Sequence, residues 1–214
     1  LRASPQFKQV SAFCPCCDGV LDPRGHHCRL CVAGPERVLR HNRTRNKSAS
    51  FAARAALRPE LEKSGLLPPS PEETNGTNTR RPADVFLPCW NNGGPAALDF
   101  AITSPQRIDA LARATQGGAS AAAAYENFKR SFQETDSQCA QQGIAFVPMV
   151  AETSGAWGPQ ALKTFRTIAK IMAQREEGDE AVSLGLMLQQ LCVIIRSGGA
   201  RAVLRRLAQL SPDI

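Results

Sequence analysis

Apolar residues follow two different periodicities along the chain, which together predict a mixed α/β fold. Small apolar residues between Ala49 and Leu57 recur at helical spacing, so one or two helices are expected over residues 36–62. Short β-prone runs predict three strands, at 85–87, 97–103 and 144–150. Further helical patterns are present at 121–139, 160–175, 181–196 and 201–209.

Two turn signals organise the first strands. Residues 64–82 are rich in Pro, Gly, Asn and Thr and predict a loop. The cluster Asn91–Pro95 predicts a turn that folds the first two strands into a hairpin. Asp84 stands at the start of the first strand. Asp99 lies on the second and points away from the face that carries its apolar neighbours. The hairpin therefore brings the two carboxylates close together.

Cysteine is unevenly distributed, with five of the eight cysteines between Cys14 and Cys31. Without a visible secretion signal we expect an intracellular protein whose thiols stay reduced, so the cluster is interpreted as metal ligands. Paired ligands on either side of a turn suit tetrahedral zinc. The expected structural zinc ligands are Cys14, Cys17, His26 and Cys31, with Cys16, His27 and Cys28 as alternatives. A metal-free loop is the competing interpretation.

The net charge of +7 comes entirely from the first part of the chain. Residues 1–83 carry 14 basic and 7 acidic residues, whereas residues 84–214 carry 12 of each. The excess is greatest over 36–58, which is typical of a phosphate-binding surface, although a solvated helix face has the same pattern. The expected nucleic-acid contacts are Arg37, Arg40, Arg43, Arg45 and Lys47. The apolar run 181–195 is too short to span a membrane, and no membrane partner is expected.

Acidic and basic residues near the predicted hairpin suggest a metal-dependent phosphodiesterase site. Such a site needs carboxylates that hold a divalent metal and a cation that orients the attacking water. Asp84 and Asp99 supply the carboxylates, Lys129 on the following helix supplies the cation, and Glu62 at the end of the preceding helix completes the set. Alternatively, Asp84 only caps a strand and Lys129 is an ordinary surface lysine.

The order of these motifs resembles the C-terminal region of non-LTR retrotransposon proteins with a restriction-like endonuclease of the PD-(D/E)xK type. The resemblance covers Cys14 to Trp157 and rests on short motifs in sequence. These are the Cys/His knuckle with Gly25-His26-His27, Arg40-His41-Asn42, Arg81-Pro82-Ala83-Asp84-Val85, Leu98-Asp99-Phe100 and Glu152-Thr153-Ser154-Gly155-Ala156-Trp157-Gly158. Two departures are that Ala83 separates Pro82 from Asp84, and that Ala101 stands where many such sites have lysine.

The resemblance implies a small mixed sheet flanked by helices, with a restriction-endonuclease-like fold and a zinc knuckle. It further implies a nuclear endonuclease that nicks double-stranded DNA to prime reverse transcription. Asp84, Asp99 and the Phe100 carbonyl would bind Mg²⁺ or Mn²⁺, Lys129 would position water, and Glu62 would contact the metal through water. Element RNA and the reverse transcriptase domain of the same polyprotein are the other expected partners.

The expected division is a zinc knuckle over 1–34, an endonuclease core over 35–158 and C-terminal helices over 159–214 that pack on the core. Two other functions compete with the nuclease. One is a catalytically inactive nucleic-acid-binding module, and the other is a domain that docks on a polymerase with a vestigial metal site. Convergence of Asp84, Asp99 and Lys129 would favour the enzyme.

Overall fold

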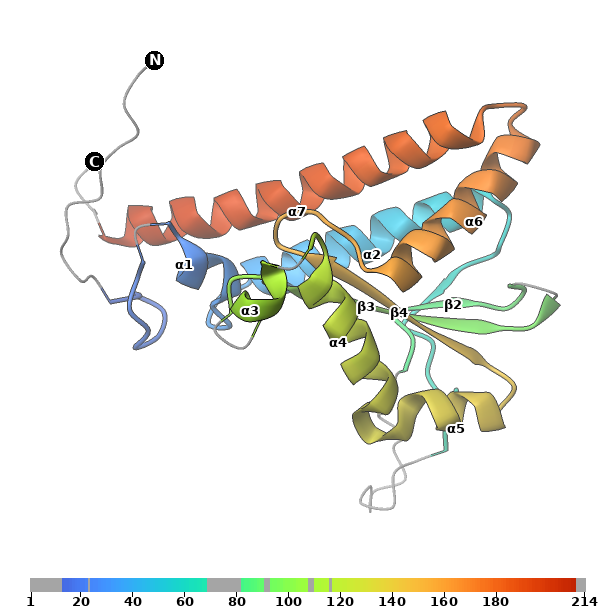
Figure 1. Cartoon of the computed structure of the whole chain (residues 1–214), viewed down its shortest axis with the longest axis horizontal. Helices are drawn as coiled ribbons and strands as arrows, with labels where there is room; N and C mark the ends of the chain where they lie inside the picture. The colour runs from blue at the N-terminus through green and yellow to red at the C-terminus, as the bar shows by residue number, and fades with distance from the viewer. Residues whose placement is uncertain are drawn as a thin grey trace.

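A four-stranded mixed sheet forms the centre of the molecule. The computed structural model describes residues 13–22, 24–68, 82–90, 93–107, 110–115 and 117–210. The strands are β1 (Glu60–Leu61), β2 (Val85–Leu87), β3 (Ala96–Thr103) and β4 (Ala145–Glu152), in the order β1-β2-β3-β4. Neighbouring strands are antiparallel except β3 and β4, which are parallel. Figure 1 shows helices on both faces, which confirms the mixed α/β prediction.

Three long helices cover one face of the sheet: α2 (Glu36–Arg54), α6 (Pro159–Arg175) and α7 (Glu180–Leu210). Alternate strand residues point into the core beneath them, because successive side chains of a strand face opposite sides. Leu98 and Phe100 of β3 point into this core, where they meet Phe51 of α2, Phe165 of α6 and Leu191 of α7. The main hydrophobic core therefore lies between the sheet and these helices.

The opposite face carries a smaller core and the more irregular helices. These are α3 (Leu111–Ala114), α4 (Ser120–Ser131), the short 3₁₀ helix η2 (Phe132–Glu134) and α5 (Thr135–Gln141). Ala97 and Phe146 pack there against Cys139 of α5. Asp99 faces this side too, because it lies two residues beyond Ala97 on the same strand.

The single helix predicted over 121–139 is wrong. Gln133 and Glu134 have positive φ angles of 50° and 55°, which break the helix between α4 and α5. Phe128 and Phe132 are 49% and 50% exposed. Their rings pack on each other at the surface with centroids 5.4 Å apart. Polar Gln133 and Glu134 carry no Gly or Pro signal that would have announced the break.

The two C-terminal helices predicted at 181–196 and 201–209 are one continuous helix, α7. An 18-residue window of α7 has a mean hydropathy of 1.4, so it is long and apolar enough to cross a membrane by length and composition. It also packs along α2 and α6 and against α1 (His26–Leu30). Position 198, inside α7, favours glycine because a Cβ there would approach the Arg40 side chain to 2.9 Å. The predicted N-terminal knuckle and C-terminal segment therefore contact each other.

The helix expected over 36–62 also ends earlier than predicted. α2 stops at Arg54, and the chain turns through Ala56 and Arg58, both with positive φ, before it forms β1. Pro59 prevents the helix from resuming at this point, because it has no amide hydrogen to donate. Glu62 consequently follows an edge strand and does not terminate a helix.

Glu36 anchors the start of α2 on the end of α7. Its two carboxylate oxygens accept hydrogen bonds from Arg205 and Arg206, each at 2.7 Å, and Arg206 is only 1% exposed. Burial alone would raise the pKa of Glu36, but its bonds with Arg206 and Arg205 outweigh burial and lower the pKa to about 2.

We predict that Glu36→Gln lowers the free energy of unfolding at pH 7 by about 1–3 kcal/mol. Because the folded-state pKa lies below the unfolded value near 4.5, this stabilisation is complete above pH 5 and disappears as the pH falls towards 2. Urea unfolding of both proteins at pH 7 and pH 3 measures the difference. Glu60→Gln, which breaks an exposed pair with Lys63, is the control and should cost less than about 0.5 kcal/mol. An equal effect of the two substitutions would contradict the anchoring role.

Candidate functional site

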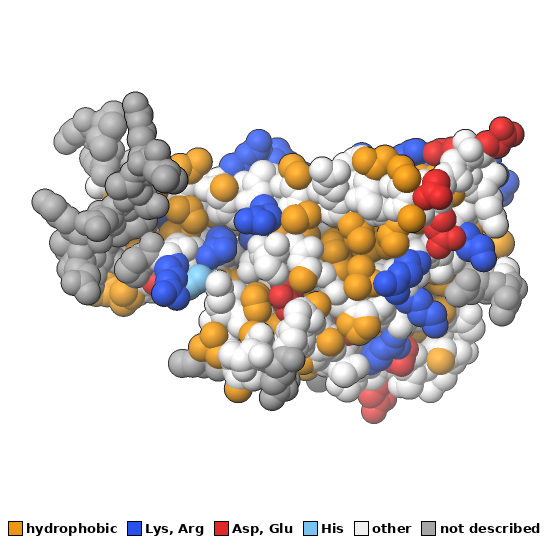
Figure 2. Space-filling model, turned by 45° about the horizontal axis from the view of Figure 1, so that its top comes forward, with side chains coloured by type: hydrophobic (Ala, Val, Ile, Leu, Met, Phe, Trp, Pro, Cys, Tyr) orange, Lys and Arg blue, Asp and Glu red, His pale blue; other side chains and the backbone are white. Residues whose placement is uncertain are grey.

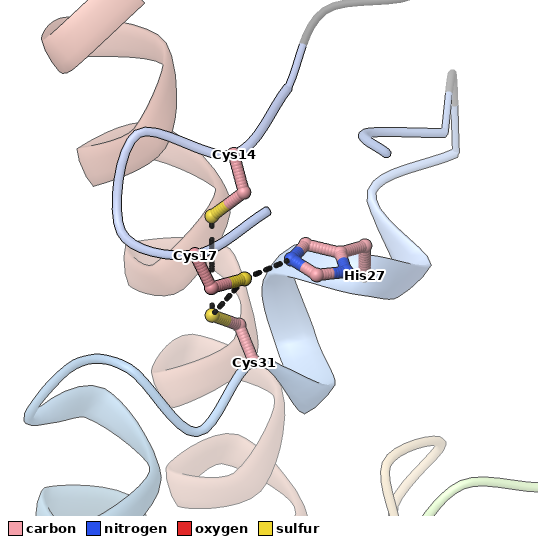
Figure 3. Close-up of side chains that lie close together, drawn as sticks. All are labelled: Cys14, Cys17, His27 and Cys31. Carbon is pink, nitrogen blue, oxygen red and sulfur yellow. Dashed lines mark hydrogen bonds between the residues drawn. The ribbon is translucent and has the colours of Figure 1, made fainter. Parts of the chain in front are cut away.

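Four metal-ligating side chains meet at the N-terminal end of the described chain. They are Cys14, Cys17, His27 and Cys31, and their ligand atoms all lie within 4.8 Å of one another (Figure 3). The Sγ atoms of Cys17 and Cys31 are 3.6 Å apart, and those of Cys14 and Cys31 are 3.9 Å apart. A zinc–sulfur bond of about 2.3 Å gives tetrahedral sulfur–sulfur edges of about 3.8 Å. The cluster could therefore hold zinc, because both its donor set and its spacing fit a tetrahedral zinc site.

The thiols of the cluster influence one another's ionisation. Burial opposes ionisation of Cys14, but the Cys16 amide and the side chains of His27, Cys17 and Cys31 lower its pKa to about 6. The Gly19 amide lowers the pKa of Cys17, but burial and the sulfur atoms of Cys31 and Cys14 raise it by more. Three thiolates so close together would repel one another, and a zinc ion bound among them would relieve that repulsion.

Arg206 gives the cluster a balancing positive charge. Three thiolates and one neutral histidine leave a zinc site with a net negative charge. Burial would lower the pKa of Arg206, but Glu36 and the nearby sulfur atoms of Cys31 and Cys14 raise it. The C-terminal helix therefore contributes to the electrostatics of an N-terminal metal site.

The structure corrects the expected histidine ligand from His26 to its neighbour His27. Both residues lie in α1, where adjacent side chains point about 100° apart, so only one can face the cysteines. Asp22 accepts a hydrogen bond from the His27 amide at 2.7 Å, and His27 Nε2 lies 3.3 Å from Cys17 Sγ. His26 Nδ1 contacts Arg29 instead, at 2.8 Å. Cys16 and Cys28 also fit the ligand spacing of the sequence, but they lie outside the cluster.

A second group of polar side chains gathers where β2 begins beside β3. Pairing of Val85 with Leu98 continues so that Asp84 lies opposite Asp99. Asp84 Oδ2 accepts a hydrogen bond from the Phe100 amide at 2.7 Å, and this amide lies on the edge of β3 beyond the start of β2. The antiparallel pairing predicted for this hairpin is thus present. Asn91 and Asn92 of its turn, Arg81, and Pro23 of the knuckle lie outside the described residues.

Lys129 reaches this group from the other side of the molecule. It lies in the last turn of α4 and forms a direct ion pair with Asp99, in which the lysine is 18% and the aspartate 24% exposed. α4 runs against β4 on the face to which Asp99 points, so the lysine stem spans from the helix to the sheet. Asp84, Asp99 and Lys129, which lie far apart in sequence, are brought together.

The two carboxyl groups have opposite pKa shifts. Burial raises the pKa of Asp99, and the charge of Asp84 adds to this effect despite the opposing charge of Lys129. Burial would also raise the pKa of Asp84, but the His41 hydrogen bond, the Phe100 amide and nearby positive charges lower it below its ordinary value. Paired carboxylates whose pKa values diverge are common at functional sites.

His41 is a member of the group that sequence reasoning left out of the site. Its Nε2 lies 3.2 Å from Asp84 Oδ1, and it approaches from α2, 43 residues earlier in the chain. The Arg40-His41-Asn42 motif was the available signal, but the hairpin argument could only connect residues on neighbouring strands.

Glu62 and Arg45 form a pair of their own next to this group. The Glu62 amide donates a hydrogen bond to the Asp84 carbonyl at 3.0 Å, so the Glu62 backbone adjoins the site. The Glu62 carboxylate forms a direct ion pair with Arg45. Arg45 is therefore buried and engaged, whereas the basic pattern predicted it as an exposed phosphate contact.

The other predicted phosphate contacts divide by their exposure on α2. Arg37 and Arg43 are exposed. Lys47 is half-buried, and its Nζ lies 4.9 Å from the centre of the Phe51 ring. Arg40 is 4% exposed and turns towards α1 and α7. The helix is thus basic without presenting one continuous basic face.

Two buried glutamates have structural roles at helix starts. Glu152 accepts hydrogen bonds from the amides of Ala121 and Ala122 at the start of α4. Glu152 does not cap the helix that follows it in the chain. That helix, α6, is capped instead by Glu126, which accepts bonds from the Gln160 and Ala161 amides at 3.1 Å. Together the two carboxylates fix the position of α4, and hence of Lys129.

No protein-family model matches the chain, and a search of curated protein sequences finds no significant match.

Proposed function

We propose that the chain is a metal-dependent DNA endonuclease domain of the restriction-like type with a structural zinc knuckle, derived from a non-LTR retrotransposon protein. The observation that carries the proposal is the meeting of Asp84, Asp99 and Lys129 at one end of the β2–β3 pair. A mixed sheet with helices on both faces fits the proposed restriction-like fold. The proposed role is to nick double-stranded DNA in the nucleus and so prime reverse transcription.

Each residue of the proposed site has a role that follows from its chemistry. Asp84 and Asp99 offer the oxygen donors that Mg²⁺ and Mn²⁺ prefer. A divalent metal bound there would polarise a phosphoryl oxygen and activate water. His41 and the Phe100 amide hold the Asp84 carboxylate in place. With a divalent metal held by the two carboxylates, Lys129 would orient the attacking water and offset developing negative charge.

A plasmid-nicking assay tests this proposal. With Mg²⁺ or Mn²⁺ the protein should convert supercoiled plasmid to the open circle, and EDTA should stop the reaction. Asp84→Asn should lower the rate more than about 100-fold, because the amide binds a divalent cation poorly. Asp136→Asn, which removes a partly exposed carboxylate that pairs with Arg130, is the control and should nick normally. Nicking by Asp84→Asn at the wild-type rate would refute the assignment.

A catalytically inactive nucleic-acid-binding or polymerase-docking module is the second candidate. The direct ion pair favours it, because Lys129 neutralises Asp99 without a metal. So do the exposed apolar side chains Val182, Leu186, Val193 and Leu204 on α7. This second candidate predicts DNA affinity, or affinity for the reverse transcriptase domain, without metal-dependent nicking.

A further inference from the structure

Arg40 is a buried cation without a carboxylate partner among the described residues. Its Nη2 donates to the Arg29 carbonyl at 3.2 Å, and its Nε has no hydrogen-bond partner. The other two buried arginines of the described chain each have an acid: Arg45 pairs with Glu62 and Arg206 with Glu36. Burial of a charge is costly unless it is paired. Arg40 therefore differs from Arg45 and Arg206 because it has no carboxylate partner among the described residues.

The surroundings of Arg40 increase this cost. Burial lowers the pKa of Arg40, and the positive charges of Arg37 and Arg29 lower it further. A guanidinium does not lose its proton in a protein, so the charge persists. Only an anion from outside the described residues can balance the positive charge of Arg40.

Two cavities near Arg40 could receive that anion: Arg40 lines one of them, and its neighbours Arg29 and Gly199 line the other. One, of about 290 Å³, has walls from the segment after α1, from α2, from the end of β3 and from α4. Arg37, Arg40, Ser104 and Tyr125 line it, with Thr103 and Arg107. The other, of about 630 Å³, is lined by residues that include Arg24, Arg29 and Arg196 together with Thr153 and Ser197. No carboxylate is among the described residues that line either cavity. We call the two cavities the arginine groove.

The arginine groove lies beside the acidic site. His41, the residue after Arg40, contacts Asp84. Thr103 lies four residues beyond Asp99 on β3, roughly 13 Å along the strand. Figure 2 shows Lys and Arg side chains near the end of the molecule that carries α1, and others beside the acidic side chains around the connection between α6 and α7. The groove and the acidic site are connected through β3 and through the adjacent residues Arg40 and His41.

We propose that the arginine groove binds a backbone phosphate of a nucleic-acid strand, with Arg40 as its buried ligand and the Ser104 and Tyr125 hydroxyls as further donors. Guanidinium groups bind phosphate oxygens through two parallel hydrogen bonds, and hydroxyls complete such sites. The bound phosphate would fix the register of the strand relative to Asp84 and Asp99. That second role rests on the proposed nuclease function, but phosphate binding itself does not.

The first test measures binding of inorganic phosphate to the zinc-loaded whole chain in a buffer without Mg²⁺ or Mn²⁺. Phosphate should raise the melting temperature of the wild-type protein and broaden its own ³¹P signal. Arg40→Gln should lose both effects, and its melting temperature without phosphate should equal or exceed that of the wild type, because an unpaired buried charge is gone. Arg54→Gln, at an exposed arginine of the same helix, should keep both effects. A phosphate response that persists in Arg40→Gln would overturn the site.

The second test distinguishes a nucleic-acid phosphate from a free phosphate ion. Duplex DNA is bound to the zinc-loaded chain without Mg²⁺ or Mn²⁺, so that no cleavage occurs, with methylphosphonate replacing one phosphate at a time. One neutralised position should weaken wild-type binding about tenfold, and Arg40→Gln should be insensitive at that position. The slope of log affinity against log salt should fall by about one in this variant. DNA binding that ignores Arg40→Gln while inorganic phosphate binding is lost would overturn the nucleic-acid assignment.

A third variant keeps the test decisive if Arg40→Gln does not fold. Arg40→Lys retains the charge without the forked donor geometry, and it should bind phosphate more weakly than the wild type. Equal phosphate affinity of Arg40→Lys and the wild type would overturn the proposed contact. These measurements do not involve cleavage. An active groove in a protein that never nicks DNA would refute only the nuclease, and the reverse result would refute only the groove.

Discussion

Removal of zinc is expected to unfold residues 14–31 and to release α1 from α7, while the sheet and its main core stay folded. α1 has only five residues, far fewer than an isolated helix needs. The buried side chains of this segment include the three cysteines Cys14, Cys28 and Cys31, and two of these belong to the metal cluster. Structural zinc contributes about 10–16 kcal/mol in small zinc-dependent folds. The segment therefore has little else that could keep it ordered.

Hydrogen exchange of the whole chain, with and without a zinc chelator, measures this effect. Amides over 14–31 should lose protection, whereas those of β3 and β4 should keep it. His27→Ala should lose the metal during purification, and the matched variant His26→Ala should retain stoichiometric zinc. Full zinc content in His27→Ala, or its loss from His26→Ala, would show that the ligand set is wrong.

Three of the four described strands were predictable because their signals are local, whereas β1 lies in a range expected to be helical. Alternation over 97–103 placed Leu98 and Phe100 on one face and Asp99 on the other, and the paired strands keep that arrangement. A hairpin signal then sufficed to bring Asp84 opposite Asp99. The mixed character of the sheet follows from the long helical connection before β4, since parallel neighbours need a crossover.

Residues that depend on tertiary packing could not be placed in the same way. His41 approaches Asp84 only because α2 crosses the sheet, a geometry that no spacing along the chain records. His26 and His27 are equivalent by spacing, and the turn at Gly25, with φ of 68°, decides which one faces the cysteines. Burial of Arg40 and Arg45 is equally invisible in a basic pattern, because the pattern records charge but not the helices that pack over it.

Asp99→Asn is expected to abolish metal-dependent nicking, with a loss of more than about 100-fold, while DNA affinity stays near that of the wild type. Loss of a partner that merely supports a metal ligand commonly costs 10–100-fold, and loss of a direct carboxylate should exceed that. Asn keeps the shape of the side chain, so the pairing of β3 with β4 is preserved. Nicking rates in Mn²⁺, together with DNA affinity in Ca²⁺, measure the two quantities separately.

Lys129→Met separates catalysis from charge balance at the same site. If Lys129 orients water, this variant should bind DNA and metal but nick at least about 100-fold more slowly. If Lys129 only neutralises Asp99, its removal frees that carboxylate for a metal, so nicking should persist or increase. Lys170→Met, an exposed lysine on α6, is the matched control and should nick normally. If Lys129→Met nicks DNA at the wild-type rate, Lys129 has no role in the reaction, and its direct ion pair with Asp99 is purely structural.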